Sequence, residues 1–405
     1  MGVSMKIGIL REGKKPADRR VALSPRQCWQ VQEIWPKIEV VVQSSEIRAY
    51  TDEEYIKAGV DVVSDVSDCD LLIGVKEVPI RELIPNKSYM FFSHTFKKQE
   101  YNKALLKAIL DKKIRLIDYE VLTNKDGRRL VGFGRYAGIV GAYNSFLAWG
   151  KKTGAYELKP AHLCKDRIEL DRELEKVVLE KNFRMVITGA GRVATGAMEI
   201  LDLIGLKKLD PEEYLKNNST SPCYAQLGVE DYNKKIDDSA FKSEEFYKYP
   251  VGFESNFMRF AKVSEMYVAC HYWDNRSPFI FSREDAKSPD FNIKLVGDIS
   301  CDIDCAVAST LRPSTISEPL YGYDPETEKE VDFMAEGAIG VMAVDNLPCE
   351  LPKDASEDFG MELVNNVFPY LFESDEDGVI ERATQTTLNG NLSPAFSYLE
   401  EWVNS

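Results

Sequence analysis

The stretch that decides the fold is Arg184-Met-Val-Ile-Thr-Gly-Ala-Gly-Arg-Val-Ala-Thr-Gly-Ala-Met198. Its apolar run, Met185-Val-Ile187, predicts a short buried strand, and after the glycines the pattern returns at helical spacing. Gly189, Gly191 and Ala194 stand in the G-x-G-x-x-A order of the dinucleotide fingerprint. Gly189 permits a tight turn and Gly191 leaves room for a pyrophosphate, whose phosphates the amides of the following helix would hold. The stretch therefore predicts a dinucleotide-binding domain.

The same pattern identifies residues that would hold the cofactor. The phosphates are expected over the turn, and an acidic residue about 20 positions on should bind the ribose. Asp210 stands at that distance and favours NAD, although the two lysines before it leave room for the 2′-phosphate of NADP. The candidate cofactor-binding residues of this stretch are Gly189, Gly191, Arg192, Val193 and Asp210.

Composition limits the class of protein. The 405 residues suffice for two or three domains. A formal charge of −15 disfavours binding to nucleic acid or to an anionic membrane, and no apolar run approaches the about 20 residues that span a bilayer. With eight scattered cysteines and only three histidines, the sequence predicts reduced thiols in the cytoplasm and no metal site.

The first part of the chain alternates strand patterns with helix patterns. Strands are expected at 6–10, 39–43, 70–75, 88–92 and 115–118, with helices beginning at Pro25, after Thr51 and from Lys98. This alternation predicts a parallel sheet covered on both faces. Ligands of such sheets bind beyond the carboxyl ends of the strands, so the residues that follow each strand are the candidates for chemistry.

Three polar side chains follow the later strands of this sheet. Lys76 comes directly after the third strand, His94 follows the fourth by two residues, and Glu120 closes the fifth. If these strands are neighbours, a lysine, a histidine and a carboxylate converge on one edge. Each residue also has a purely structural alternative. Lys76 could be a solvated side chain at a strand end, and His94 could be a histidine whose hydrogen bonds are satisfied within a turn.

Arginines are the candidate ligands for an acidic substrate. The global charge would repel such a substrate, so its carboxylates need arginines placed close by, which bind them bidentately. Arg20 lies in the first loop, and Arg129 and Arg135 lie in the glycine-rich stretch 127–142 that leads into a long helix. Surface solvation is the alternative for each of them.

The second half of the chain continues the strand rhythm after an interruption. Residues 211–260 form a polar stretch that we expect to be an insertion of surface helices and loops. Strands resume at 266–270, 295–296 and 340–344, and a polar loop with Asp302 follows the middle one. An amphipathic helix over 354–372 is expected to return to the first domain.

These residues together resemble the alanine dehydrogenase/saccharopine dehydrogenase superfamily over nearly the whole chain. The likeness is greatest to the lysine-forming saccharopine dehydrogenases and to the lysine–2-oxoglutarate reductase half of the bifunctional lysine-degrading enzyme. The motifs that carry it are Arg19-Arg-Val-Ala-Leu-Ser-Pro25, Gly74-Val-Lys-Glu-Val-Pro79, Phe92-Ser-His-Thr-Phe96, Gly127-Arg-Arg129, Phe133-Gly-Arg-Tyr-Ala-Gly138, Thr188-Gly-Ala-Gly-Arg192, Asp298-Ile-Ser-Cys-Asp302 and Val344-Asp-Asn-Leu-Pro348.

The resemblance implies a fold and roles for several residues. It implies two Rossmann-like parallel-sheet domains around a central cleft, the first of them discontinuous. We expect residues 1–145 and 352–405 to form the substrate domain, and 146–351 to form the NAD(P)-binding domain. On the family pattern Lys76 and His94 match the acid–base pair, Arg20 and Arg129 match ligands of the substrate carboxylates, and Asp302 matches an acid beside the nicotinamide.

The expected activity is that of an NAD(P)-dependent oxidoreductase acting on a CH–NH bond. It would join L-lysine with 2-oxoglutarate to give saccharopine, or cleave saccharopine in reverse. The alternatives are an alanine dehydrogenase-like amino-acid dehydrogenase and a transhydrogenase-like nucleotide-binding subunit without amine chemistry. The direction of the reaction stays open, and so does the choice between a monomer and a homo-oligomer.

Overall fold

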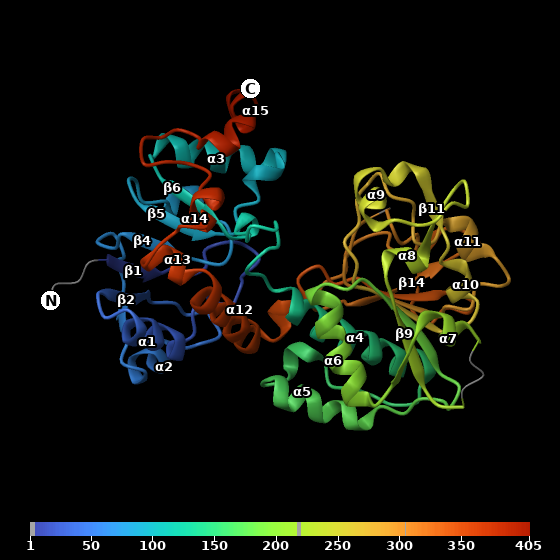
Figure 1. The fold of residues 1–405 in the computed structure, drawn as a ribbon. Coiled ribbons are helices and arrows are strands. Elements are labelled where there is room, and N and C mark those ends of the chain that lie inside the picture. Colours follow the sequence, from blue (N-terminus) through green and yellow to red (C-terminus); the bar gives the residue numbers. More distant parts are fainter. Residues whose placement is uncertain (1–4, 217–219, 304) are drawn as a thin grey trace. The chain divides into compact units, whose positions relative to one another are not determined.

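The computed structural model describes residues 5–216, 220–303 and 305–405. The chain divides into two compact units, one made of Met1–Phe133 with Pro352–Ser405 and the other of Gly134–Leu351. In Figure 1 the first unit carries the blue, cyan and red segments, because both parts of the chain build it. None of the helices in the described ranges is both long and apolar enough to cross a bilayer.

The first unit is built on a six-stranded parallel sheet. Its strand order is β3-β2-β1-β4-β5-β6, and every pairing is parallel. The strands are β1 (Met5–Ile9), β2 (Ile38–Gln43), β3 (Asp61–Val63), β4 (Leu71–Ile73), β5 (Ser88–Phe91) and β6 (Arg115–Asp118). The sequence missed β3, since its three residues are too short to show a period.

Helices cover this sheet and join the two ends of the chain. Ser24 and Thr51 cap the first two helices through capping boxes, in which side chain and backbone satisfy each other's donors. The last part of the chain packs on the first, because Ser356 Oγ accepts from Val21 N at 2.9 Å. The helices of this unit are α1 (Pro25–Ile34), α2 (Asp52–Lys57), α3 (Lys103–Asp111), α12 (Pro352–Asn366), α13 (Phe368–Phe372), α14 (Val379–Ala383) and α15 (Glu400–Asn404).

The second unit has an eight-stranded sheet with the order β15-β14-β16-β13-β12-β7-β9-β8. The pairings of β14 with β15 and β16 are antiparallel, and the other pairings are parallel. The strands are β7 (Arg184–Thr188), β8 (Lys207–Leu209), β9 (Cys223–Leu227), β12 (Met266–Ala269), β13 (Leu295–Asp298), β14 (Leu320–Asp324), β15 (Lys329–Val331) and β16 (Ile339–Met342).

The expectation that 211–260 is an insertion of surface helices and loops is wrong for part of this stretch. β9 lies inside the sheet between β7 and β8, and its residues Cys223, Tyr224, Ala225 and Leu227 are buried. The rest of the stretch forms short elements around it: α7 (Pro211–Lys216), α8 (Val229–Tyr232), β10 (Asn233–Lys235), α9 (Ser243–Lys248), β11 (Phe253–Ser255) and α10 (Met258–Ala261). The other helices of the unit are α4 (Gly134–Thr153), α5 (Arg167–Glu173), α6 (Arg192–Ile204) and α11 (Arg283–Lys287).

Glycines let two helices of the second unit approach backbone to backbone. A Cβ on Gly138 of α4 would overlap the carbonyl oxygen of Val193 on α6, and a Cβ on Gly196 of α6 would overlap the carbonyl oxygen of Arg135 on α4. Gly196 therefore allows α6 to pack closely on α4. Because the whole of α4 packs within this unit, the boundary between the units lies at Gly134 and not at 146.

We predict that Gly138→Ala destabilises the protein, although glycine-to-alanine changes inside helices ordinarily stabilise by roughly 0.5–1 kcal/mol. The new methyl group would overlap the Val193 carbonyl oxygen, and overpacking of this kind costs about 1–3 kcal/mol. Urea unfolding of the variant measures the change. Gly252→Ala is the control, because no described atom lies within 4 Å of a Cβ at that position; equal stability of the two variants would contradict the close packing.

Candidate active site

Polar side chains gather at one edge of the six-stranded sheet. Neighbouring strands β1, β4, β5 and β6 run parallel, so their carboxyl ends share that edge. Glu12 follows β1, Lys76 follows β4, His94 follows β5 and Glu120 follows β6. The structure thus places the lysine, the histidine and the carboxylate expected from the sequence on one edge and adds a second carboxylate, Glu12.

His94 is held by its neighbours on this edge. Its Nδ1 lies 3.0 Å from Glu120 Oε2, while Nε2 lies 4.0 Å from Glu77 Oε1, beyond hydrogen-bond distance. The imidazole stacks on Phe92 with an angle of 18° between the rings. The contact with Glu120 and the stacking on Phe92 therefore fix the orientation of the ring.

Positively charged side chains surround the carboxylate of Glu120. Its Oε1 lies 2.7 Å from Lys97 Nζ and 3.0 Å from Arg129 Nη2. Burial raises the pKa of Glu120, but hydrogen bonds from His94 and Lys97 and the charges of Lys97 and Arg129 outweigh it and lower the pKa to about 2. Glu120 is therefore ionised at neutral pH and orients the histidine.

Lys76 is positioned through its backbone by a buried carboxylate. Glu12 accepts hydrogen bonds from Val75 N at 2.7 Å and from Lys76 N at 2.9 Å. Burial raises the pKa of Glu12 to about 7, against the lowering effect of these two bonds. Glu12 consequently fixes the turn that presents Lys76 and changes its protonation near neutral pH.

Arg20 is buried on the same side of the unit. Its guanidinium pairs with Asp18, with Nε 3.0 Å from Oδ1 and Nη2 2.6 Å from Oδ2, and its Cζ lies 4.2 Å from the centroid of the Phe133 ring. Burial raises the pKa of Asp18, but the charge and hydrogen bonds of Arg20 and the charge of Lys76 lower it overall. Arg20 and Lys76 thus act on the same carboxylate, and surface solvation does not describe Arg20.

A buried hydrogen-bond network fixes the turn that carries His94. Asp118 Oδ2 accepts from Ser93 N at 3.0 Å, from Ser93 Oγ and from Gln385 Nε2 at 3.0 Å. Thr95 Oγ1 donates to Gln385 Oε1 at 2.6 Å. His94 itself has φ of 55°, a left-handed conformation that few residues other than glycine adopt. The C-terminal segment therefore helps to hold the histidine.

The glycine turn of the second unit fits a dinucleotide. Gly189 has φ of 97°, and a Cβ there would lie 2.6 Å from the carbonyl oxygen of Cys270, so only glycine suits the position. Gly191 is the N-cap of α6, and no side chain caps this end. Within the described part of the chain, no atom lies within 4 Å of a Cβ on Gly191. Arg192 and Val193 begin the helix, so their amides point towards this open space, as phosphate binding requires.

Two other expected site residues, Arg135 and Asp302, belong to the second unit. Arg135 belongs to the second unit, where Nε lies 2.6 Å from Glu199 Oε1 and Nη2 lies 3.0 Å from Glu199 Oε2; Arg20, Glu120 and Arg129 belong to the first unit. Asp302 follows β13, and burial, with the charge of Asp298, raises its pKa.

Asp210 follows β8 at the edge of the sheet. Its Oδ1 accepts from Glu212 N at 3.0 Å, at the start of α7. The fingerprint acid is expected on the strand next to β7, but that strand is β9. Asp210 therefore stands one strand further out than the spacing in the sequence implies.

Several residues near the candidate site of the first unit were not identified from the sequence patterns considered above. Glu12, Glu77 and Lys97 are close to strands that were recognised, so the rule that residues after parallel strands share an edge could have found them. Asp118 and Gln385 are 267 positions apart, and no local pattern joins them. Among the residues that the structure describes, no group of three or more His, Cys, Asp and Glu side chains could hold a metal ion.

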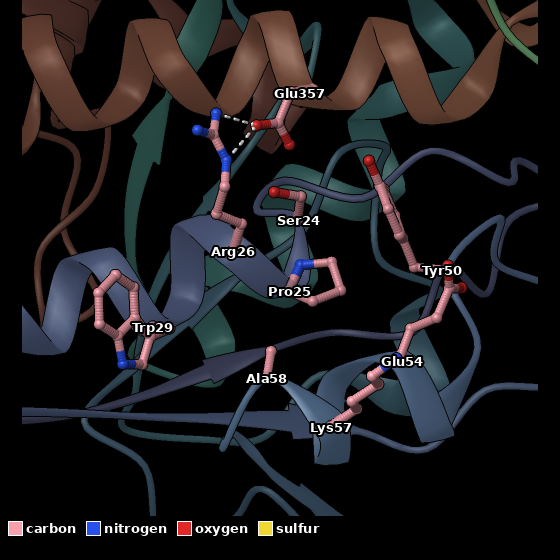
Figure 2. Close-up of a pocket in the computed structure, with 9 residues that line it drawn as sticks. All are labelled: Ser24, Pro25, Arg26, Trp29, Tyr50, Glu54, Lys57, Ala58 and Glu357. Atoms are coloured by element: carbon pink, nitrogen blue, oxygen red, sulfur yellow. Dashed lines mark hydrogen bonds and ion pairs between the residues drawn. The ribbon is translucent and has the colours of Figure 1, made fainter.

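A cavity of about 620 Å³ lies elsewhere on the first unit. Figure 2 shows Arg26 directed towards Glu357, with which it forms an ion pair, and Trp29, Tyr50 and Lys57 around the opening. None of the candidate catalytic residues lines this cavity. It therefore forms no part of the candidate active site.

Comparison with known proteins agrees with this arrangement. Residues 8–140 match the family model "Alanine dehydrogenase/PNT, N-terminal domain". The chain is 30% identical to alpha-aminoadipic semialdehyde synthase of Bos taurus over 96% of this chain and 45% of that protein. It is 26% identical to saccharopine dehydrogenase [NAD(+), L-lysine-forming] of Neurospora crassa, covering 88% of each. It thus spans about half the length of the first relative and most of the second.

A solved structure shows the fold. An L-alanine dehydrogenase matches with a TM-score of 0.63 at 16% identity, over 98% of this chain and 100% of that one. The α/β fold with Rossmann-like parallel sheets that we expected from the sequence is therefore confirmed, and so is the family resemblance carried by its motifs.

We predict that the Glu120→Gln variant loses stability at pH 7 and that this loss shrinks as the pH falls. The pKa of Glu120 lies at about 2 in the folded chain against 4.5 ordinarily, so its stabilisation is present above pH 4.5 and disappears as the pH approaches 2. The loss at pH 7 should be at most about 3 kcal/mol. Urea unfolding between pH 7 and 3.5 measures it. Glu33→Gln, on the exposed face of α1, is the control; a loss independent of pH would show that packing and not charge explains the effect.

Proposed function

We propose that the chain is an NAD(P)-dependent oxidoreductase acting on a CH–NH bond, which condenses L-lysine with 2-oxoglutarate to saccharopine or cleaves saccharopine in reverse. The observation that carries the proposal is the pairing of His94 with Glu120 on the sheet edge that also presents Lys76. A proton-exchanging pair beside a buried arginine is what reductive amination of a 2-oxo acid needs. The name of the Neurospora crassa relative, an L-lysine-forming saccharopine dehydrogenase, supports lysine and saccharopine as substrates.

The proton steps of this reaction suit Lys76 and His94. The amine nitrogen attacks the carbonyl carbon of the 2-oxo acid, and the carbonyl oxygen becomes a hydroxyl that must leave as water. One of the two side chains takes the proton from the amine and the other gives a proton to the departing hydroxyl. Glu120 holds the imidazole through Nδ1, so that Nε2 is the nitrogen that exchanges the proton.

The remaining chemistry divides between arginines and the cofactor. When bound, the nicotinamide dinucleotide supplies hydride to the imine carbon or accepts it in the reverse direction. Gly189, Gly191, Arg192 and Val193 would hold its phosphates. Arg20 and Arg129 would bind substrate carboxylates, since guanidinium groups form paired hydrogen bonds with them. Both arginines already contact carboxylates, Asp18 and Glu120, and these would keep the guanidinium groups in place.

Two other functions predict different outcomes of one assay. Purified protein is incubated with NADH or NADPH, a 2-oxo acid and an amine, and oxidation of the cofactor is followed at 340 nm. Turnover with 2-oxoglutarate and lysine supports the proposal. Turnover with pyruvate and ammonia indicates an alanine dehydrogenase-like enzyme. Cofactor binding without turnover for any pair indicates a nucleotide-binding subunit without amine chemistry.

We predict that Lys76→Met and His94→Gln each slow turnover by about 10²–10⁴-fold, while NAD(H) binding persists. The pH–rate profile of the unchanged protein should be bell-shaped and should report pKa values of the pair. The double variant should lose less than the product of the two single losses, because residues that act as a unit are not additive. Steady-state rates and cofactor titrations measure these effects.

Lys107→Met on the exposed face of α3 is the control for loss of a lysine charge. Its turnover should equal that of the unchanged protein. Near-normal turnover of either active-site variant would remove that residue from the chemistry.

A further inference from the structure

Strand order identifies which acid faces the adenosine ribose. In a dinucleotide-binding sheet this acid stands at the carboxyl end of the strand beside the first one. Here the first strand is β7, and its neighbour on that side is β9, whereas β8 lies beyond β9 at the edge. The strand that follows β7 in the sequence is therefore not its neighbour in the sheet.

Register excludes Asp210 from that place. Leu209 pairs with Ala225, which pairs with Val186, so Asp210 is level with Ile187 and stops two residues short of Gly189. It also lies two strands away, or about 10 Å from β7 at the usual strand spacing. Its carboxylate already accepts the amide of Glu212 at 3.0 Å, which fits a role at the start of α7.

Glu230 lies just beyond the carboxyl end of β9, the strand beside β7. Thr188 pairs with Leu227, so Gly189 and Gly228 are the first residues beyond the edge on the two strands. A Cβ on Gly228 would lie 2.6 Å from Glu230 Oε1 and 2.7 Å from Oε2. The Glu230 carboxylate thus fills the space that a side chain at position 228 would take, beside the phosphate-binding turn.

Three neighbouring charged groups, Asp231, Lys208 and Arg259, form hydrogen bonds within the chain. Asp231 Oδ2 accepts the amide of Gly228 at 2.7 Å. Lys208 Nζ donates to Gln226 Oε1 at 2.7 Å, and Arg259 Nη1 donates to Glu212 Oε1 at 2.9 Å. Glu230 is exposed, so its carboxylate can meet a ligand.

We propose that Glu230 accepts hydrogen bonds from the hydroxyls of the adenosine ribose and makes the chain prefer NAD(H) to NADP(H). This inference rests on the proposed function, which requires a dinucleotide but leaves its identity open. A carboxylate binds two vicinal hydroxyls well, whereas a 2′-phosphate removes one of these donors and brings a like charge against Glu230. Selection between the two cofactors follows from that single contact.

Calorimetric titration with fragments that lack the nicotinamide tests this without any turnover. The probes are ADP-ribose and 2′-phospho-ADP-ribose, which differ only in the phosphate. The unchanged protein should bind ADP-ribose at least about tenfold more tightly, since hydrogen bonds to charged groups are strong. In Glu230→Gln this ratio should fall about fivefold or more, because the charge is gone. Equal or tighter binding of 2′-phospho-ADP-ribose by the unchanged protein would overturn the proposal.

Asp210→Asn is the matched control, because it removes the acid at the spacing expected from the sequence. Its two affinities should stay within about twofold of the unchanged values. A ratio that changes in Asp210→Asn and not in Glu230→Gln would overturn the assignment. Failure of the proposed function gives a different result. If NADH, NADPH and both fragments all fail to bind, the whole dinucleotide assignment is wrong. Turnover of lysine and 2-oxoglutarate with NADPH but not with NADH would overturn only the role of Glu230.

Discussion

Parallel pairing of four neighbouring strands is the constraint on which the candidate site depends. β1, β4, β5 and β6 all end at one edge, and each is followed by a polar side chain that the buried sheet cannot accommodate. Glu12, Lys76, His94 and Glu120 meet there because the backbone directions agree, although up to 108 positions separate them in the chain. The same constraint in the second unit sets Gly189 beside Gly228.

Two carboxylates on this edge have pKa values shifted in opposite directions because their surroundings differ. Glu120 is surrounded by His94, Lys97 and Arg129, which lower its pKa to about 2. Glu12 is buried and accepts hydrogen bonds from the amides of Val75 and Lys76, and its pKa rises to about 7. One carboxylate therefore remains a fixed negative charge, and the other titrates near neutral pH. In a protein of formal charge −15, the net charge decides neither outcome: nearby cations lower the pKa of Glu120, and burial raises the pKa of Glu12.

The sequence sufficed for the elements and for the residues that follow them, but not for the order of strands. The glycine stretch and many of the strands could be predicted because their patterns are local, whereas β3, β14 and β15 were missed. β9 escaped notice because Cys223–Leu227 stands inside a long polar stretch, and the fingerprint then assigned the acid by distance along the chain to Asp210. Burial of β9 between β7 and β8 depends on pairing across the sheet, which spacing does not record.

Distant contacts also decide how firmly His94, the candidate catalytic histidine, is held. His94 has φ of 55°. Such a conformation costs a non-glycine residue about 1–3 kcal/mol, and it persists only where the surrounding structure holds the residue in place. Hydrogen bonds of the two flanking residues hold His94 in this conformation: Ser93 donates to Asp118, and Thr95 donates to Gln385. Gln385 comes from the C-terminal part of the chain, which completes the first unit. A discontinuous unit is thus a condition for the geometry of His94, because the first part of the chain alone lacks the amide that closes this network.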